Sequence, residues 1–303
     1  MAVYEHSYKH YSGPLTPEWS RFLIIPRHAY RDVFRSKLFT AFFVICFAPL
    51  LVEAILIYLH HNVGALGIMR VNVRELVPID AWFFEVFVGV QGGFAFLLTL
   101  LVGPPLVARD LTNNALPLYL CRPFSRAEYV FGKMCVVLIL LSAVTWVPGL
   151  ILFLFQSYLE GFSWFGQNLW IGSAILLSSV AWILLLTLLS QTVSAWVKWR
   201  MAASAALIAV YLIPSVFSEV INLTFGTKWG NIISVQALGR NVTAGLFGTF
   251  VRTSTYISDF GSGPHEVIVN EPPLWCSWLA LCLICGLCLA LLSRKLKAYE
   301  VVR

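Results

Sequence analysis

The sequence predicts an all-α integral membrane protein with six transmembrane helices, and three observations lead to this fold class. Hydrophobic residues make up 59% of the 303 residues and charged residues only 12%, whereas soluble domains carry roughly 25% charged residues. Six stretches are long and apolar enough to cross a hydrocarbon core of about 30 Å. Basic residues are concentrated in the connections on one side of those stretches, as expected of a protein that crosses the bilayer repeatedly.

The N-terminal region is expected to form a tail followed by an interfacial helix. Residues 1–16 are polar, lack the apolar core of a cleavable signal peptide and are interpreted as a cytoplasmic tail. Within residues 17–37, Arg27, Arg31 and Arg35 recur every four residues and therefore lie on one side of a helix. The apolar stripe of the same helix comprises Tyr30, Val33, Phe34 and Leu38. We expect an amphipathic elbow helix in the membrane interface, with its arginines at the lipid head groups.

Residues 38–303 are interpreted as a single six-span transmembrane domain. The predicted spans lie near residues 38–59, 86–108, 134–155, 169–189, 201–221 and 274–292. An even number of spans places both termini on one side, and that side carries most of the 21 Lys and Arg residues. The positive-inside rule therefore predicts that both termini are cytoplasmic. The net charge of +6 is explained by this topology and by contact with anionic lipid, not by nucleic-acid binding.

The longest predicted loop, residues 222–273, lies on the outer side of the membrane. Its segment 232–250 is moderately apolar and rich in Gly, Thr and Val, which makes it too polar for a seventh span. We expect short helices in this loop. Whether they rest on the outer face or re-enter the membrane is left open by the sequence.

No catalytic motif is present in the sequence. Phe131-Gly132-Lys133-Met134 contains Gly-Lys but lacks the earlier glycine and the following Ser or Thr of a Walker phosphate loop. HExxH and G-x-S-x-G signatures are also lacking. The sequence therefore predicts that this chain is not itself an enzyme and holds no cofactor or metal.

Cys282, Cys285 and Cys288 in the last span have the spacing CxxCxxC. A metal cluster would require a fourth ligand and a loop that wraps around the metal, whereas steps of three drift around the axis of a helix. We favour the interpretation that these cysteines are small packing residues.

Three polar residues within the spans are candidates for a translocation pathway: Glu53, Gln91 and Glu219. A charge deep in hydrocarbon costs at least about 2.5 kcal/mol and is usually kept for a pathway or a partner. Snorkelling or a local hydrogen bond is the alternative explanation. On the pathway hypothesis, Glu53 and Gln91 face a central cavity near its outer gate. In the same second span, Gly103-Pro104-Pro105 should bend or unwind the inner end.

The connection between the second and third spans is polar, basic and interrupted by proline. Its features, in chain order, are Arg109-Asp110, Leu116-Pro117-Leu118-Tyr119-Leu120, Arg122-Pro123, Ser125-Arg126, Glu128-Tyr129 and Gly132-Lys133. This ordered run, combined with six spans and a basic entry helix, resembles the membrane permeases of the bacterial ABC type-2 exporter class. The sequence departs from that class at Asn113-Asn114-Ala115, where a turn with Gly or Thr is frequent, and at Cys121, where Ser is usual.

The resemblance implies a transmembrane permease subunit of an ATP-driven exporter in the bacterial inner membrane. Two copies, or this chain and a sibling, would form a homo- or heterodimer, and separate P-loop ATPase subunits would bind the ATP. Residues 109–128 would form a short cytoplasmic coupling helix. The coupling residues expected from it are Arg109, Asp110, Asn113, Asn114, Arg122, Pro123, Arg126 and Glu128. Such charges suit a docking cleft, and the alternative is a solvated turn that only fixes topology.

Two other classes of function are weighed against the exporter. The first is a non-transporting membrane anchor or assembly factor whose loop recruits a cytoplasmic partner. The second is a membrane-embedded enzyme, which the lack of catalytic motifs disfavours. No residue pattern selects among drugs, lipids, glycans, peptides and sodium as the exported substrate.

Overall fold

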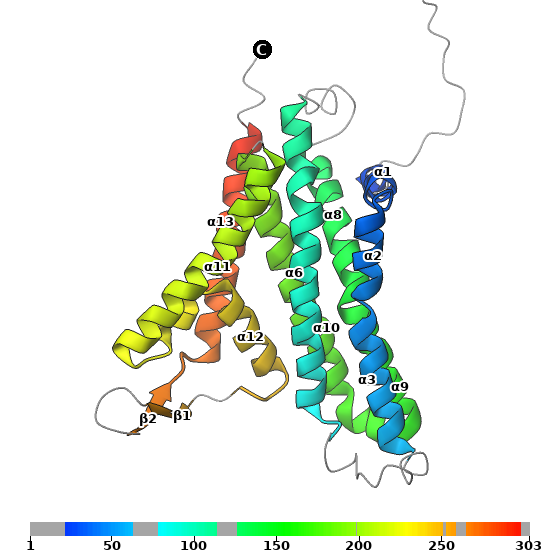
Figure 1. The fold of residues 1–303 in the computed structure, drawn as a ribbon, viewed down its shortest axis with the longest axis vertical. Helices are drawn as coiled ribbons and strands as arrows, with labels where there is room; N and C mark the ends of the chain where they lie inside the picture. Colours follow the sequence, from blue (N-terminus) through cyan, green and yellow to red (C-terminus); the bar gives the residue numbers. More distant parts are fainter. Residues whose placement is uncertain are drawn as a thin grey trace, which may run out of the picture.

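The chain folds into a bundle of long helices in the computed structural model, which describes residues 22–62, 78–113, 126–197, 199–250, 253–258 and 265–297 (Figure 1). Six helical segments are long and apolar enough to cross a membrane. They overlap the six predicted spans, so the all-α class and the number of spans are confirmed. We call the end of the bundle that carries α1, the end of α6 and the start of α8 the α1 end, and the opposite end, with β1 and β2, the hairpin end.

The spans are formed by α2 with α3, by α6, by α8 with α9, by α10, by α11 and by α13. The described elements are α1 (Ile24–Val33), α2 (Lys37–Ile45), α3 (Ala48–His61), α6 (Ala81–Thr112), α8 (Arg126–Val144), α9 (Trp146–Glu160), α10 (Phe162–Trp196), α11 (Arg200–Phe225), η2 (Trp229–Ile232), α12 (Val235–Leu246), β1 (Thr253–Ser258), β2 (His265–Asn270) and α13 (Leu274–Lys297).

Two of the spans are broken where the sequence carries a proline. The first span is interrupted between α2 and α3, directly before Pro49, and the third span between α8 and α9 at Thr145, three residues before Pro148. A proline inside a helix lacks the N–H for the ladder and clashes with the carbonyl four residues earlier. At the first break, the Nε2 atom of Gln91 donates to the carbonyl oxygen of Cys46 over 3.1 Å and so satisfies a carbonyl at the interruption.

The second span remains helical through Pro104 and Pro105, so the predicted unwinding is not observed. Two serines from other helices bond to its backbone there. The Ser194 hydroxyl donates to the Pro104 carbonyl over 2.6 Å and accepts from the Ala108 N–H over 2.9 Å. The Ser204 hydroxyl lies 3.4 Å from the carbonyl of Leu100, the residue whose ladder partner would be Pro104. Neighbouring helices therefore satisfy backbone groups around the prolines, as in other membrane helices.

Helix α10 occupies the centre of the bundle and packs on α6, α8, α9, α11, α12 and α13. Small residues allow the closest approaches: a Cβ atom on Gly103 would lie 2.7 Å from the Ser190 Cβ, and one on Gly149 would lie 2.7 Å from the Ile175 Cγ2. Close contact through small residues is a principal source of helix association in lipid, where burying apolar surface gains little. The first contact fixes α6 against α10 and the second fixes α9 against α10, and the cavity described below lies on the pair of α6 and α10.

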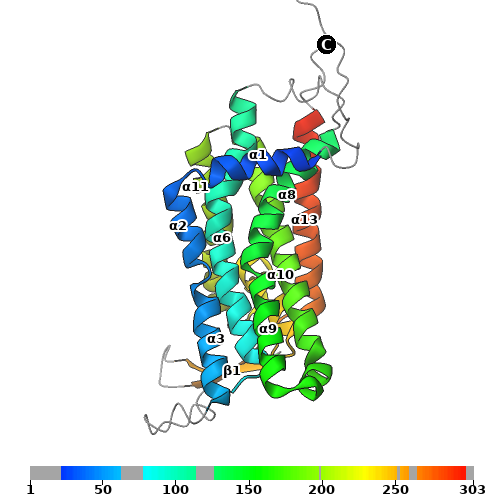
Figure 2. The same cartoon turned by 90° about the vertical axis from the view of Figure 1, so that its right-hand side faces the viewer.

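Helix α1 lies across the spans instead of along them (Figure 2). The Arg27 and Arg31 side chains of α1 are exposed, as the four-residue spacing predicts, and so is Arg35, which lies two residues beyond the end of the helix. Tyr30 and Val33 pack against the apolar core between α2, α6 and α8. Leu38 departs from the predicted apolar stripe because it belongs to α2 and is 85% exposed.

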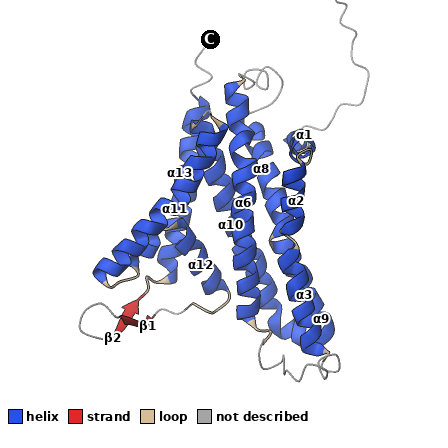
Figure 3. Cartoon of the chain, viewed as in Figure 1, coloured by secondary structure: helices blue, strands red, loops and turns tan. Residues whose placement is uncertain are grey.

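The region between α11 and α13 contains two short helices and a hairpin. After α11 the chain turns back, and the Ser234 hydroxyl at the start of α12 lies 3.0 Å from the Ser215 hydroxyl within α11. From there α12 runs toward the hairpin end, packed among α6, α10, α11 and α13. The antiparallel pair β1–β2, with Thr253 opposite Asn270, was not predicted (Figure 3).

Candidate functional site

The first candidate site is a polar cluster at the α1 end that joins α6 to α8. The Asp110 carboxylate lies 2.8 Å from Lys133 Nζ and accepts a hydrogen bond from the Tyr129 hydroxyl over 2.7 Å. The side chains of Asp110 and Lys133 are 15% and 9% exposed, so the ion pair is largely shielded from water. We call Asp110, Tyr129 and Lys133 the clamp. It joins the last turn of α6 to the first two turns of α8, and so holds the two ends of the connection between them together.

Helix α1 packs on the same part of α8. A Cβ atom on Gly132 would lie 2.8 Å from the Ile25 Cδ1 and 3.0 Å from the carbonyl oxygen of Phe22, so only glycine allows α1 to lie this close. One turn further along α8, the Tyr30 hydroxyl donates to the Val136 carbonyl over 2.8 Å. Burial raises the pKa of the Tyr30 phenol, which keeps it neutral and able to donate. Tyr129 and Lys133, at the two ends of this run, therefore belong to the clamp, and Gly132 between them contacts α1.

The predicted coupling residues fall into three groups. Arg109 and Asn113 are exposed at the end of α6. Asp110 is directed inward to the clamp, and Glu128 is half-buried on α8. Asn114, Arg122 and Pro123 lie outside the described residues, as does the side chain of Arg126.

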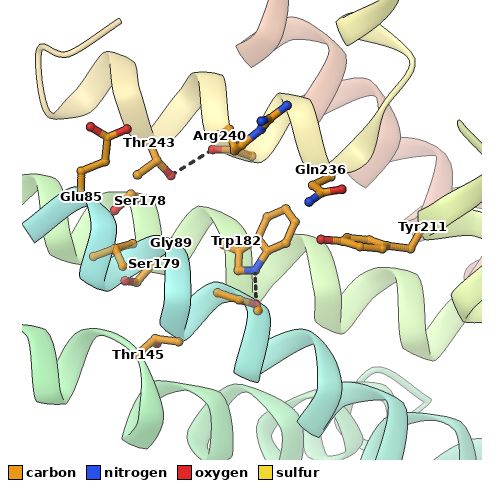
Figure 4. Close-up of a pocket in the computed structure, with 14 residues that line it drawn as sticks. Glu85, Gly89, Thr145, Ser178, Ser179, Trp182, Tyr211, Gln236, Arg240 and Thr243 are labelled. Carbon is orange, nitrogen blue, oxygen red and sulfur yellow. Dashed lines mark hydrogen bonds between the residues drawn. The ribbon is translucent and has the colours of Figure 1, made fainter. Parts of the chain in front are cut away.

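The second candidate site is a cavity of about 300 Å³ between α6, α10, α11 and α12 (Figure 4). The α6 wall is formed by Gly89, Gly92 and Gly93, where the backbone itself borders the space. Trp182 and Tyr211 contribute aromatic surface from α10 and α11. A cavity of this size is at the lower end of the range for small-molecule sites.

Trp182 connects the two sides of this cavity. Its indole N–H donates to the Gly92 carbonyl over 3.1 Å. On the other side, a Cβ atom on Gly239 of α12 would lie 2.7 Å from the Trp182 Cε3. The indole is therefore inserted between a glycine of α6 and a glycine of α12. Because Trp182 lies near the middle of α10, this contact places α12 at the level of the spans.

Helix α12 contributes three polar side chains to the cavity. Gln236, Arg240 and Thr243 are spaced by four and three residues and line the cavity from one side of that helix, while Ala237, Leu238 and Val242 are buried on its other side. Opposite, Glu85 on α6 accepts a hydrogen bond from Thr249, just beyond the end of α12. Deep in the wall, the Ser179 hydroxyl is buried and has no hydrogen-bond partner within the described part of the chain.

The three residues predicted for a translocation pathway do not come together, and none of them lines this cavity. Gln91 is fully buried and donates a hydrogen bond to the Cys46 carbonyl at the break between α2 and α3. Glu53 is half-buried on α3, and its Oε2 atom is buried without a partner among the described residues. Glu219 is exposed on α11.

The cysteines of α13 differ in exposure: Cys282 is exposed, Cys285 is half-buried and Cys288 is buried. No group of three or more His, Cys, Asp or Glu side chains suited to a metal ion occurs in the described ranges.

Sequence reasoning missed several residues of both sites. Tyr129, Gly132 and Lys133 were part of the recognised motif but were not assigned a role, although their positions on consecutive turns of one helix were a usable signal. Arg240 was counted only for topology, and its spacing from Gln236 and Thr243 on a helix was the signal for a polar face. Trp182 carried no signal, because its role depends on glycines distant in the sequence.

No protein-family model matches the chain, and no similar protein is found among curated sequences. The resemblance to the ABC type-2 exporter class is therefore a resemblance of the residue pattern of 108–133 and of the expected architecture alone.

Proposed function

We propose that this chain is the transmembrane permease subunit of an ATP-driven exporter in a bacterial inner membrane, coupled to a separate P-loop ATPase. The observation that carries the proposal is the clamp of Asp110, Tyr129 and Lys133. A force on the connection between α6 and α8 is passed to both helices at once only if the two ends of that connection are tied together. Coupling between distant sites requires such a contiguous, packed element.

The position of α1 supports the same reading. Because α1 lies against Gly132 and Val136 of α8, a displacement of the clamp also displaces α1 and the span that follows it. The first, second and third spans would then move as one unit. Alternating access requires an element with two packed arrangements. A cytoplasmic partner that binds one arrangement better than the other shifts the equilibrium toward it.

The charge distribution supports the proposed orientation, with the α1 end in the cytoplasm. Exposed basic residues of the described ranges at that end are Arg27, Arg31, Arg35, Lys37, Arg109, Arg200 and Arg294. The hairpin end carries acidic groups, among them Asp80, Glu160 and Glu271. An excess of Lys and Arg in short loops marks the cytoplasmic side.

The cavity favours an exporter over the alternative, a membrane anchor that only recruits a cytoplasmic protein. An anchor needs an exposed docking loop but no polar cavity among its spans. Here the cavity is lined by Glu85, Arg240 and Gln236, and such groups are expensive at membrane depth unless they serve a ligand or a pathway.

The test is affinity purification of the chain in mild detergent from its own host, with identification of co-purifying proteins and an ATPase assay. We expect a stoichiometric P-loop ATPase. The charge-reversed pair Arg122→Glu and Arg126→Glu should release it. Arg294→Glu is the matched control, because Arg294 is an exposed arginine at the same end of the bundle but on α13, and it should leave the complex intact.

Recovery of the chain without any ATPase in several detergents would favour the anchor. An ATPase that stays bound and active after both loop reversals would show that the connection from α6 to α8 does not dock it.

A further inference from the structure

We propose that the cavity between α6, α10, α11 and α12 binds an amphiphile whose anionic group contacts Arg240 and whose apolar part lies along Trp182 and the glycine face of α6. This inference rests on the cavity alone. It holds whether the bound molecule is transported or is a resident lipid-like ligand, and it needs no ATPase partner.

The Arg240 guanidinium is unpaired in the described part of the chain. Arg240 is among the residues that line the cavity, its side chain is exposed, and it forms no hydrogen bond or ion pair within the described residues. The helix that carries it begins beside Ser215 within α11 and contacts Trp182 near the middle of α10, so Arg240 lies at the level of the spans. A guanidinium at this depth costs at least about 2.5 kcal/mol without a partner. An anionic ligand group would supply that partner, and Arg binds carboxylates and phosphates in a bidentate manner.

A second polar group without a partner in the described chain is the hydroxyl of Ser179. This side chain is 2% exposed, lines the cavity, and has neither donor nor acceptor partner in the described ranges. The neighbouring Ser178 differs, because its hydroxyl donates to the Ala174 carbonyl over 2.6 Å. Buried polar atoms are almost always hydrogen-bonded. The Ser179 hydroxyl is therefore a covered polar group beside the cavity whose hydrogen-bonding capacity is unused within the described residues.

One strip of the cavity wall is apolar, whereas Thr145, Ser178, Tyr211, Gln236 and Thr243 line other parts of it. Gly89, Gly92 and Gly93 present a side of α6 without side chains, Val88 adds an aliphatic group, and Trp182 adds an indole whose N–H is already bonded to Gly92. This surface offers dispersion contacts to an alkyl chain or a flat ring and no further donor. A ligand with one polar end and one apolar end matches such a wall.

Glu85 determines the orientation in which an anionic ligand lies along the cavity. Its carboxylate also lines the space, but Thr249 already donates to it, and no ion pair joins it to Arg240 within the described chain. Like charges repel, so an anionic group is directed away from Glu85 and toward Arg240. The Glu85 carboxylate and the Arg240 guanidinium therefore remain separate at the cavity. They do not neutralise each other as the two members of a structural ion pair would.

The experiment uses the purified chain in dodecyl maltoside, titrated with dodecyl phosphate, which has the same alkyl chain and an anionic head. Binding is read as the rise in the thermal unfolding midpoint with ligand concentration, because a ligand that binds only the folded state stabilises it by mass action. Inorganic phosphate, titrated in parallel, separates an amphiphile site from a site for free anions.

We expect dodecyl phosphate to bind the native chain, and Arg240→Gln to weaken its binding at least tenfold, since one hydrogen-bonded charge contributes about 1.5–3 kcal/mol. Arg240→Lys should retain most of the binding, and Arg200→Gln, an exposed arginine outside the cavity, should retain all of it. Ser179→Val, which fills the cavity, should also weaken binding, whereas Ser173→Val on the exposed face of α10 should not.

Equal binding by the native chain and by a folded Arg240→Gln variant would overturn the proposal. Equal binding of inorganic phosphate and dodecyl phosphate would overturn the role of the apolar wall. Both results are independent of whether an ATPase co-purifies with the chain.

Discussion

The Oδ2 atom of Asp110 lies 2.8 Å from the Nζ atom of Lys133, and this ion pair joins the end of α6 to the start of α8 across a connection that contains most of the recognised motif. The Tyr129 hydroxyl donates to the same carboxylate oxygen, so one oxygen accepts from a cation and from a phenol. The Lys133 carbonyl in turn lies 3.4 Å from the Gln191 Nε2 of the central helix α10. The clamp is therefore connected to the core of the bundle.

The clamp should be required for stability. Replacing Lys133 by Met leaves the Asp110 carboxylate shielded from water without its cation, and removing one partner of a buried pair costs about 3–5 kcal/mol. We expect a clear fall in the thermal unfolding midpoint of the purified variant. The double variant Asp110→Asn, Lys133→Met should be less destabilised than the sum of its parts, because no charge is left alone. Lys37→Met, at an exposed position, is the control; a Lys133→Met variant no less stable than this control would contradict the prediction.

Gly132 should not tolerate a side chain. Gly132→Val places a branched group where a single Cβ atom would already meet the Phe22 carbonyl at 3.0 Å. We expect this crowding to push α1 away from α8, since overpacking of this kind costs about 1–3 kcal/mol. We expect faster proteolysis within α1, measured on the reconstituted protein. Gly286→Val, in a helix where no atom lies within 4 Å of the added Cβ, is the matched control. Equal proteolysis of the two variants would show that α1 does not depend on this contact.

Local sequence patterns predicted the parts of the fold that depend on composition, namely the six spans and the exposed arginines of α1. A run of about twenty apolar residues is sufficient for a span, because nothing else satisfies the backbone in lipid. Hydropathy averaged over such a run hides the breaks before Pro49 and Pro148, although each proline was itself a signal.

The candidate sites depend on pairs that the sequence does not bring together. Asp110 was expected to face the ATPase because it is charged and lies in a loop motif, but it turns inward to a lysine 23 positions further along the chain. Trp182 meets Gly92 and Gly239 only after three helices have packed. The hairpin β1–β2 was missed because its strands are short and lie in a loop for which only short helices and turns were expected.

Gln91 is expected to act on stability and not on the transport step. Gln91→Leu removes the donor to the Cys46 carbonyl at the break between α2 and α3, and a buried acceptor left unsatisfied costs about 1–3 kcal/mol. The yield of folded protein and its unfolding midpoint should fall, while transport per folded molecule stays unchanged. Gln167→Leu, at an exposed position of α10, should alter neither. A normal midpoint combined with lost transport would instead place Gln91 on the translocation pathway.

The contact of Gly239 with Trp182 should hold α12 in place over the cavity. In Gly239→Leu the new side chain collides with the indole ring, which cannot retreat because its N–H is bonded to Gly92 on the other side. We expect α12 to move away from α10 and the cavity to open.

The measurement is the rate at which a membrane-impermeant maleimide labels a cysteine placed at Gln236 in a background without native cysteines. Gly239→Leu should raise this rate. Trp182→Ala in the same chain removes the collision and should lower the rate again, whereas Gly166→Leu, where no atom lies within 4 Å of the added Cβ, should have no effect. An unchanged rate in Gly239→Leu would mean that the contact with Trp182 does not hold α12 in place.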